Sequence, residues 1–490
     1  MNYETVIGLE IHIQLNTKSK TFCSCSTEFG APPNTHTCPV CLGLPGALPV
    51  LNEEVVRKGM SAGLALNAHV ENRSVFARKN YFYPDLPKAY QISQYELPIN
   101  TGGQVRICTS EGTEKRIGIT RAHLEEDAGK LVHDENPQGP SYVDFNRCGV
   151  PLLEIVTEPD IRDPDEAYQF LVAIKEIMQY AGVSECNMEK GELRVDVNIS
   201  LRMFGEPAFG VKQEIKNMNS FANVKRALEY EMKRQSKLLR SGEKLVQQTR
   251  LFDVNKNATI PMRSKEEAED YRYFPDPDLV PMDLTEKEIE KMREALPELP
   301  EAKRTRFVGE YGLTEYDAAN LCTNLKMANY FEEAVRGYEK PKKIANWMLS
   351  ELMRYINEQR IEIDKSTVTP VMLRELFDLM DSGVISGKIA KDVFTDMMSS
   401  GNSAGSIVER KGLKQVTDEG ELDAVISEVI SENANAVEEL RGGKEKAFGF
   451  LVGQVMKKTK GKANPKLANR LLKEKIGGLH DVEQREGGTD

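Results

Sequence analysis

The chain has 490 residues, of which 40% are hydrophobic and 29% are charged, and its formal net charge is −11. That length accommodates roughly two to four domains. The sequence has no apolar run long enough to cross a bilayer and no signal-peptide core, which argues against a membrane or secreted protein. We therefore expect a cytoplasmic protein with no membrane contact.

The first predicted element is a strand over residues 6–15, which reads VIGLEIHIQL. Successive side chains of a strand point to opposite faces. Glu10, His12 and Gln14 therefore share one face, and the isoleucines and leucines between them share the other. The strand is predicted to place an apolar face in a core and a polar face with candidate metal ligands opposite it.

Two close cysteine pairs follow this strand, with twelve residues between them: Cys23, Cys25, Cys38 and Cys41. Cysteines at this spacing are typical of a structural zinc site, so the sequence predicts a zinc knuckle over residues 23–41. The other four cysteines stand singly, at positions 108, 148, 186 and 322, which does not indicate a disulfide framework. We interpret each of them as a small buried apolar residue.

Three further segments alternate between polar and apolar residues and are predicted strands: 115–127, 192–202 and 211–217. Their polar faces carry both acids and bases: Arg121, His123, Glu125, Asp127, Arg194, Asp196, Asn198, Glu214 and Lys216. An ordinary half-exposed sheet explains any one of these strands. If the polar faces converge, however, the carboxylates need a counter-charge, which divalent cations supply, while Lys and Arg hold phosphate oxygens. That combination favours phosphoryl transfer, although the sequence has no Walker-type phosphate loop.

Helix signals lie between and after these strands. Asp163 followed by Pro164 predicts the start of a helix that runs to about Tyr180, because Asp is a good N-cap and Pro fits the first helical position. A second helix is predicted over residues 220–239, and residues 285–288 form a capping box. From about residue 293 onward the apolar period is helical, so the strands belong to an N-terminal domain.

The segment from Arg441 to Lys475 contains eleven Lys and Arg but only two acids, so it carries a charge of +9 within an acidic protein. Such asymmetry indicates a polyanion partner. A solvated basic helix face explains the same pattern, and the segment alone does not separate the two interpretations.

Taken together, several segments resemble the B chain of the aspartyl/glutamyl-tRNA amidotransferases, the GatB family. The matching segments run nearly from end to end: VIGLEIH at 6–12, RKNYFYPD at 78–85, AYQISQ at 89–94, ITRAHLEEDAGK at 119–130, PLLEIV at 151–156, RVDVNIS at 194–200, KNMNSF at 216–221, DYRYFP at 270–275 and GFLVGQVM at 449–456.

The resemblance implies an α+β chain of three parts. Residues 1–293 are expected to form a catalytic domain, in which a β-sheet cradle similar to that of glutamine synthetase is joined by the zinc knuckle. Residues 294–408 are expected to form an all-α helical domain, and residues 409–476 a small, basic helical tail domain that binds tRNA. Residues 477–490 are expected to be disordered.

The resemblance also implies the reaction. ATP phosphorylates the side-chain carboxylate of misacylated Asp-tRNA(Asn) or Glu-tRNA(Gln), and ammonia then displaces phosphate to leave the amide. A partner amidase, the A subunit, releases the ammonia from glutamine, and the pair is braced by the small C subunit. This chain itself has no recognisable glutaminase nucleophile. Whether one tRNA or both are substrates stays open.

Combined with the resemblance, the strand patterns assign roles to particular residues. We expect Mg²⁺ ligands at Glu10, His12 and Glu125, and further contacts to metal or ammonia at Asp196 and Glu214. Lys79 and Arg194 are expected to hold phosphate, and the four knuckle cysteines to hold a structural Zn²⁺. The expected tRNA contacts are Lys457, Lys458, Lys460, Lys462, Lys466, Arg470 and Lys473.

Two other functions stay open. One is a tRNA-binding adaptor in which the carboxylate-rich sheet face is structural, and the other is a free-standing ligase that uses free ammonia and a small acid. The presence of Glu10, His12 and Glu125 favours an enzyme over an adaptor. The basic tail argues against the free-standing ligase.

Overall fold

The computed structural model describes residues 3–133, 139–264, 271–413, 419–441, 444, 446–459 and 463–486. The chain divides into two compact units between Lys303 and Arg304. The domain boundaries predicted at 293 and 408 both fall inside continuous helices, α4 (Glu286–Ala295) and α12 (Ala404–Lys411). Among the described residues, no helix is long and apolar enough to span a bilayer.

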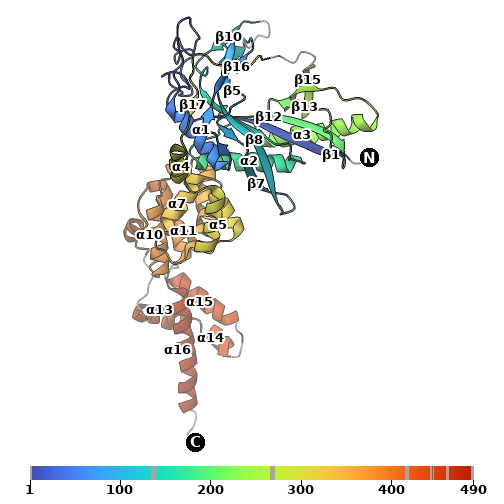
Figure 1. Ribbon diagram of the computed structural model, residues 1–490. Helices are drawn as coiled ribbons and strands as arrows, with labels where there is room; N and C mark the ends of the chain where they lie inside the picture. Colours follow the sequence, from blue (N-terminus) through green and yellow to red (C-terminus); the bar gives the residue numbers. More distant parts are fainter. Residues whose placement is uncertain are drawn as a thin grey trace. The chain divides into compact units, whose positions relative to one another are not determined.

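The first unit is built on one large mixed sheet (Figure 1). Its strands lie side by side in the order β15 (Ala258–Ser264), β14 (Gln248–Asp253), β13 (Gln213–Lys216), β12 (Leu193–Met203), β1 (Tyr3–Gln14), β11 (Pro151–Thr157), β8 (Glu114–Glu126), β6 (Asn100–Thr101) and β2 (His69–Val70), and β7 (Gln104–Cys108) pairs with β8. The neighbouring pairs are antiparallel except β13 with β14, which is parallel.

One face of this sheet is apolar and covered by helices. On β1 the side chains of Ile7, Leu9, Ile11 and Ile13 are at most 1% exposed, whereas the residues between them are half-buried. Helices α1 (Glu53–Ala65), α2 (Pro164–Tyr180) and α3 (Phe221–Arg240) cover this apolar face and complete its core (Figure 1). Burial of this face fixes which side chains of every strand remain on the opposite, polar face.

Smaller strand pairs surround the large sheet. β4 (Phe76–Asn80) lies between β5 (Tyr90–Gln94) and β16 (Phe274–Pro275), which ties the segment after residue 271 to the segment that carries Lys79. The other pairs are β9 (Lys130–His133) with β10 (Ser141–Asp144), and β3 (Arg73–Ser74) with β17 (Met282–Asp283).

The second unit is helical throughout its described part. Its elements are α5 (Pro300–Tyr311, which crosses the unit boundary), α6 (Glu315–Cys322), α7 (Leu325–Val335), α8 (Pro341–Trp347), the π-helix η1 (Met348–Leu352), α9 (Met353–Gln359), the 3-10 helix η2 (Ile363–Lys365), α10 (Pro370–Asp381), α11 (Gly387–Ser400), α12, α13 (Glu419–Glu432), α14 (Ala434–Arg441), α15 (Lys446–Lys458) and α16 (Pro465–Glu486). Trp347 packs edge-on against Phe377 and Phe394 in the first group of helices. Helices α13 to α16 enclose a separate core around Leu422, Leu451 and Leu472.

The structure confirms the α+β expectation and most of the predicted elements. Helix α2 begins at Pro164, with the Asp163 side chain accepting from the Glu166 N–H, and the capping box at Thr285 and Glu288 is formed. Helix α16 extends to Glu486, into the segment expected to be disordered, and residues 487–490 lie outside the described part.

Candidate active site

Cross-strand register brings polar residues from four strands into one row. His12 on β1 lies opposite Glu154 on β11 and opposite Arg194 on β12, and Glu154 lies opposite His123 on β8. Residues that face each other across antiparallel strands point to the same side of the sheet. The four side chains therefore share the polar face of the sheet, which we call the polar floor.

The rows on either side extend the polar floor. Glu10 on β1 lies directly opposite Asp196 on β12. Leu152 on β11 lies between Gln14 on β1 and Glu125 on β8 and is paired with both. From the sequence, we expect Glu10, His12 and Glu125 to meet around one ion. The structure brings His12 and Glu125 together and adds Glu154 to them.

His12, Glu125 and Glu154 offer ligand atoms that all lie within 4.8 Å of one another. The Nε2 atom of His12 is 3.5 Å from Oε1 of Glu125 and 3.3 Å from Oε2 of Glu154. The Nε2 atom of His123 is 3.5 Å from the same oxygen of Glu154. Two carboxylates and an imidazole in such a group form a donor set that fits a divalent cation, because carboxylate oxygens are preferred ligands of Mg²⁺.

The ionisation of this cluster shows an excess of negative charge. Burial alone would lower the pKa of His12, but its hydrogen bond to Glu154 and the charge of Glu125 outweigh burial and raise the pKa to about 9. Burial raises the pKa of Glu125 to about 7, although the charge of His12 opposes it. A proton on His12 is therefore the counter-charge of the cluster, and a bound divalent cation would replace it.

Lys79 adds a positive charge beside the cluster. It lies on β4, with Nζ 4.8 Å from the ring centre of Tyr271 and 5.9 Å from that of Tyr81. Burial lowers its pKa, but the charges of Glu125 and Glu154 and the neighbouring tyrosines together outweigh burial, so the pKa is raised and the ammonium group persists. Within the described part of the chain, no carboxylate lies close enough to form an ion pair with it.

Asp127 holds a second cation at the edge of the polar floor. Its Oδ2 atom is 3.0 Å from Nη2 of Arg194, accepts from Nε2 of Gln14 at 3.1 Å, and is 3.5 Å from Nε of Arg147. The Asp127 side chain is almost fully buried. Arg194, which was predicted to hold phosphate, is thus fixed in place by a buried carboxylate, while its own Nε is buried without a hydrogen bond.

The remaining predicted residues form a second polar group further along the floor. Glu10 accepts a hydrogen bond of 2.9 Å from Asn198 and does not belong to the cluster of His12. Asp196 and Glu214 both bind Lys216, at 2.8 and 3.1 Å. These acids therefore have protein partners in the structure, and the structure does not bring them to the ligand atoms of His12.

Sequence reasoning did not select Glu154 or His123 as ligands. Glu154 is the one charged residue of a strand that otherwise reads as a buried run, PLLEIVT, and a lone acid in such a run is the signal that was available. His123 was placed on the correct face, but only the pairing of β8 with β11 shows that it meets Glu154.

The four knuckle cysteines also form a cluster, with sulfur atoms within 4.8 Å of one another: Cys23, Cys25, Cys38 and Cys41. Four thiolates around Zn²⁺ lie roughly 3.8 Å apart when each Zn–S bond is about 2.3 Å. The hydrogen bond to Cys23 lowers the pKa of Cys41 to about 4, with a further contribution from Lys20. The donor set and its geometry fit a structural zinc ion.

The knuckle is joined to residues 145–149. The ammonium group of Lys20, which is completely buried, donates to the carbonyl of Phe145 at 3.4 Å and lies 3.6 Å from the sulfur of Cys41. The Cys148 thiol donates to the carbonyl of Cys41 at 3.2 Å. Cys148, Cys186 and Cys322 are buried as expected, whereas Cys108 is exposed at the end of β7, so the interpretation of Cys108 was wrong.

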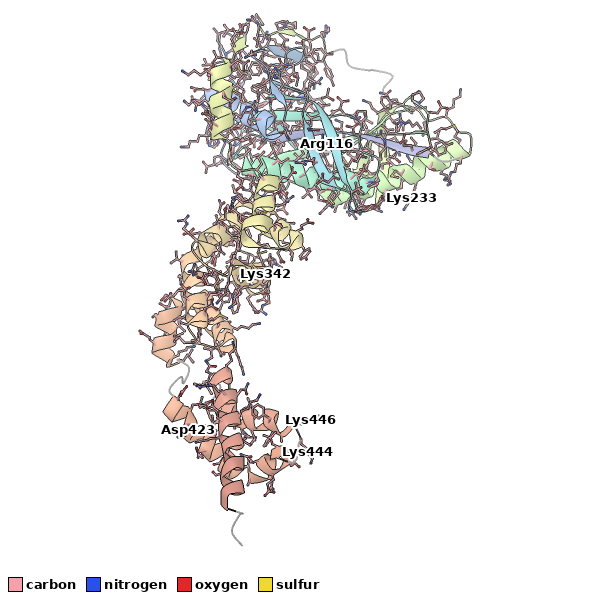
Figure 2. All side chains as sticks on the ribbon, turned by 60° about the horizontal axis from the view of Figure 1, so that its bottom comes forward. Arg116, Lys233, Lys342, Asp423, Lys444 and Lys446 are labelled. Carbon is pink, nitrogen blue, oxygen red and sulfur yellow. The ribbon has the colours of Figure 1, made fainter. Side chains whose placement is uncertain are left out.

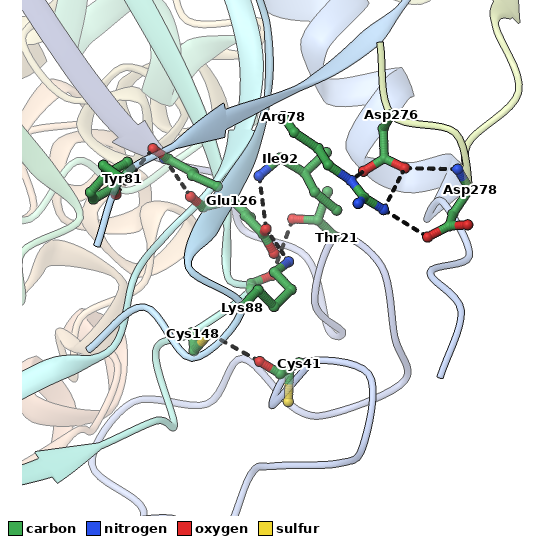
Figure 3. Close-up of polar contacts among 12 residues, drawn as sticks. Thr21, Cys41, Arg78, Tyr81, Lys88, Ile92, Glu126, Cys148, Asp276 and Asp278 are labelled. Atoms are coloured by element: carbon green, nitrogen blue, oxygen red, sulfur yellow. Dashed lines mark hydrogen bonds and ion pairs between the residues drawn. The ribbon is translucent and has the colours of Figure 1, made fainter. Parts of the chain in front are cut away.

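A cavity of about 230 Å³ separates the knuckle from β4 and β5. Figure 3 shows Lys88 paired with Glu126, whose carboxylate also accepts from the Ile92 N–H at 2.9 Å. Figure 3 also shows Arg78 held by Asp276 and Asp278. These ion pairs fix the strands that carry Lys79 and Glu125.

In the tail, several basic side chains are already neutralised. Lys458 lies 2.8 Å from Glu428 and from Glu432, and Arg470 pairs with Glu419. Lys473 lies 5.6 Å from the ring centre of Phe448, while Lys457 and Lys466 have no acidic partner in the described part of the chain. Lys460 and Lys462 lie outside the described residues.

Family models match both parts of the chain. The GatB/GatE catalytic domain matches residues 5–290, which include the polar floor and the knuckle, and the GatB domain matches residues 329–476. The first match defines the class of protein, since this domain is described as catalytic.

Full-length relatives identify the particular family. The chain is 56% identical over 476 residues to the B subunit of the aspartyl/glutamyl-tRNA(Asn/Gln) amidotransferase of Thermoanaerobacter pseudethanolicus, covering 97% of this chain and 100% of the relative. It is 57% identical over 476 residues to the corresponding protein of Caldanaerobacter subterraneus, with the same coverage. It is 55% identical over 475 residues to that of Persephonella marina, covering 97% and 99%. The chain belongs to the family of aspartyl/glutamyl-tRNA(Asn/Gln) amidotransferase B subunits.

Replacing one knuckle cysteine should release zinc. We expect Cys38→Ser to lower zinc affinity by at least about 100-fold, because losing a ligand costs more than the 10–100-fold cost of losing only a supporting hydrogen bond. Elemental analysis of the purified protein measures the ion, and Cys108→Ser is the matched control because Cys108 is exposed and outside the cluster. Freshly purified wild-type protein without zinc would contradict the assignment.

Replacing Glu154 should weaken cation binding at the polar floor. We expect Glu154→Gln to raise the dissociation constant for Mg²⁺ by about tenfold or more, since it removes one charged ligand of the cluster. Isothermal titration calorimetry measures the change. Glu114→Gln, at the exposed start of β8, is the control for loss of one negative charge, and equal affinities in the two variants would exclude Glu154 as a ligand.

Proposed function

We propose that the first unit phosphorylates the side-chain carboxylate of an aspartate or glutamate attached to tRNA and then converts it to the amide. The observation that carries this proposal is the group of His12, Glu125 and Glu154 beside the charged, half-buried Lys79. Clustered carboxylates, and a lysine with no ion pair among the described residues, suit the polyphosphate of a nucleotide with its cation. The amidation itself is supported by the names of the relatives.

The reaction proceeds in two steps. A carboxylate oxygen of the aminoacyl group attacks the γ-phosphorus of ATP, the bond from that phosphorus to the bridging oxygen breaks, and ADP leaves. Ammonia then attacks the carbonyl carbon of the acyl phosphate, inorganic phosphate leaves, and the nitrogen loses a proton. The same carbon thus exchanges an oxygen for a nitrogen, and the ester bond to tRNA is unchanged.

The protein's own groups bind and orient the reactants. Lys79 holds the transferring phosphoryl group as a point charge, and Arg194, fixed by Asp127, offers a second positive charge at the edge of the floor. A Mg²⁺ ion held by His12, Glu125 and Glu154 would offset the charge on the phosphate oxygens. Glu10, Asp196 and Glu214 keep the adjoining part of the floor negative, which suits ammonium or a further cation.

The proposal includes partners and a structural metal. The relatives are named as subunits, and we propose that an amidase, the A subunit, releases ammonia from glutamine and that the assembly also contains a small C subunit. The substrate is Asp-tRNA(Asn), Glu-tRNA(Gln) or both. We assign Zn²⁺ at the knuckle a structural role, since four thiolates leave no open ligand position.

We propose that the helical tail, α13 to α16, contacts tRNA. Lys457 and Lys466, together with Lys473 and the exposed Lys446 (Figure 2), supply its positive charge, whereas Lys444 is paired with Glu439 at 3.0 Å. Because such contacts go mainly to phosphates, they hold the tRNA without reading its sequence and weaken with salt.

The Glu125→Gln variant distinguishes an amidating enzyme from a tRNA-binding adaptor. In the complex reconstituted with its partner proteins, we expect amide formation on radiolabelled aminoacyl-tRNA to fall at least about 1,000-fold, because a ligand and its charge are lost. Binding of tRNA in a filter assay should be unchanged. Glu114→Gln is again the control. Full amidation by the Glu125 variant would leave only the adaptor function.

Removing unpaired cations from the tail tests the tRNA contact. We expect Lys457→Ala with Lys466→Ala to raise KM for aminoacyl-tRNA by about tenfold and to reduce the slope of log affinity against log salt concentration by about 1.5. Arg470→Ala is the matched control, because Arg470 is paired with Glu419. A KM equal to that of wild type would favour the free-standing ligase.

A further inference from the structure

Strand β8 changes its alternation in the middle. Ile117 and Ile119 are buried in the apolar core, and so are Ala122 and Leu124, although the two pairs differ in parity. The register with β11 supplies the reason: Val156 lies opposite Arg121, and the next residue, Thr157, lies opposite Ile119. Thr120 is therefore an extra residue, a β-bulge, and the faces exchange across it.

The bulge is held by two acids that follow β11. The Thr120 hydroxyl donates to Glu158 at 2.7 Å, and the Gly118 N–H donates to Asp160 at 2.9 Å. Uninterrupted alternation from Ile117 would have directed Arg121 into the apolar core. The bulge places it on the polar floor instead, in line with His123 and Glu125. Bulges beside functional sites commonly redirect a side chain in this way.

Arg121 lacks a counter-ion in this position. In the described part of the chain no carboxylate lies within 4.0 Å of its guanidinium group, and its Nε is buried without a hydrogen bond. Other arginines of the sheet differ: Asp127 holds Arg194 and Glu4 holds Arg202. The bulge thus turns a partly buried guanidinium group toward the polar floor, where the described residues offer it no counter-ion. Such a group needs an anionic ligand.

The position of Arg121 relative to the cluster indicates which anion. Along β8, Arg121 and Glu125 flank His123 on the same face, two residues away on either side. The Nε2 atom of His123 in turn lies 3.5 Å from Glu154 of the cluster. An anion bound to a cation on the cluster of His12, Glu125 and Glu154 would therefore also reach Arg121.

We propose that Arg121 is a catalytic residue that contacts the phosphate oxygens of the substrate on the polar floor. The guanidinium group offers parallel N–H donors that match two oxygens of one phosphate. The phosphate belongs either to the polyphosphate of ATP or to the 3′-terminal nucleotides of tRNA. This inference rests on the proposed function and singles out a residue that the sequence placed on a polar face without naming it as a site residue.

Arg121→Gln and Arg121→Lys in the assembled enzyme test the proposal. If the phosphate is that of ATP, we expect Arg121→Gln to raise KM for ATP or lower kcat, with kcat/KM for ATP reduced about 100-fold, and Arg121→Lys to recover part of the loss. Affinity for ATP should fall while affinity for adenosine, which has no phosphate, stays the same. A merely structural role would weaken both ligands together.

If the phosphate is that of tRNA, KM for aminoacyl-tRNA rises instead and ATP affinity is unchanged. Arg116→Gln is the matched control, because Arg116 lies on the same strand before the bulge and is exposed at the surface (Figure 2). Kinetics of Arg121→Gln equal to those of this control for both substrates would overturn the proposal. If thermal melting shows that Arg121→Gln does not fold, the Arg121→Lys variant is used instead. A loss of affinity for ATP without a loss of affinity for adenosine supports the proposal, and an equal loss for both contradicts it.

Failure of this inference and failure of the proposed function are distinguishable. If Glu125→Gln abolishes amidation but Arg121→Gln does not affect it, only the role of Arg121 is wrong. If Glu125→Gln remains fully active, the phosphoryl-transfer function itself is wrong, whatever the Arg121 variants do.

Discussion

The antiparallel pairing of β1 with β11 and β12 is the constraint on which the polar floor depends. It places Arg194, His12, Glu154 and His123 in one row, and a slip of one residue would send all of β1 to the opposite face. The register is held from the other side of the sheet, where four apolar residues of β1 are excluded from water. The hydrophobic core thus sets the geometry of a polar cluster that it does not contact.

Because the register is fixed, charges that repel one another are kept close together. Glu125 and Glu154 cannot separate. Their charges raise the pKa of His12 against the effect of burial, whereas burial, together with the charge of Glu154, raises the pKa of Glu125. Lys79 and Arg121 lie beside these acids without forming ion pairs with them in the described part of the chain. Because these acids and bases do not pair with one another, the acids remain available to a cation and the bases to phosphate oxygens. This arrangement suits a nucleotide polyphosphate with its cation.

The knuckle and the polar floor are connected through one loop. Lys20 and Cys41 hold residues 145–149 on one side, and on the other side Arg147 donates to the carbonyls of Ala128 and Gly129, next to Asp127. Asp127 in turn positions Arg194. A structural metal in the knuckle would therefore stabilise the loop that supports Asp127 and Arg194, although no cysteine belongs to the polar floor.

The amino-acid sequence by itself determined the features that depend on near neighbours. Alternation gave the faces of β1 and β12, the Asp163 and Thr285 caps gave two helix starts, and cysteine spacing gave the sulfur cluster, because each pattern acts within a few residues. Only the tertiary structure decided which polar residues meet. Glu154 replaced Glu10 in the cluster of His12, and the pairing of β8 with β11 revealed the bulge at Thr120 that allows Arg121 to share the polar face with His123 while Ile117 and Ile119 stay buried. In the tail, only packing showed that Lys458 and Arg470 are neutralised by acids from another helix. The reason is that register, bulges and inter-helix ion pairs join residues distant in sequence, so no local pattern specifies them.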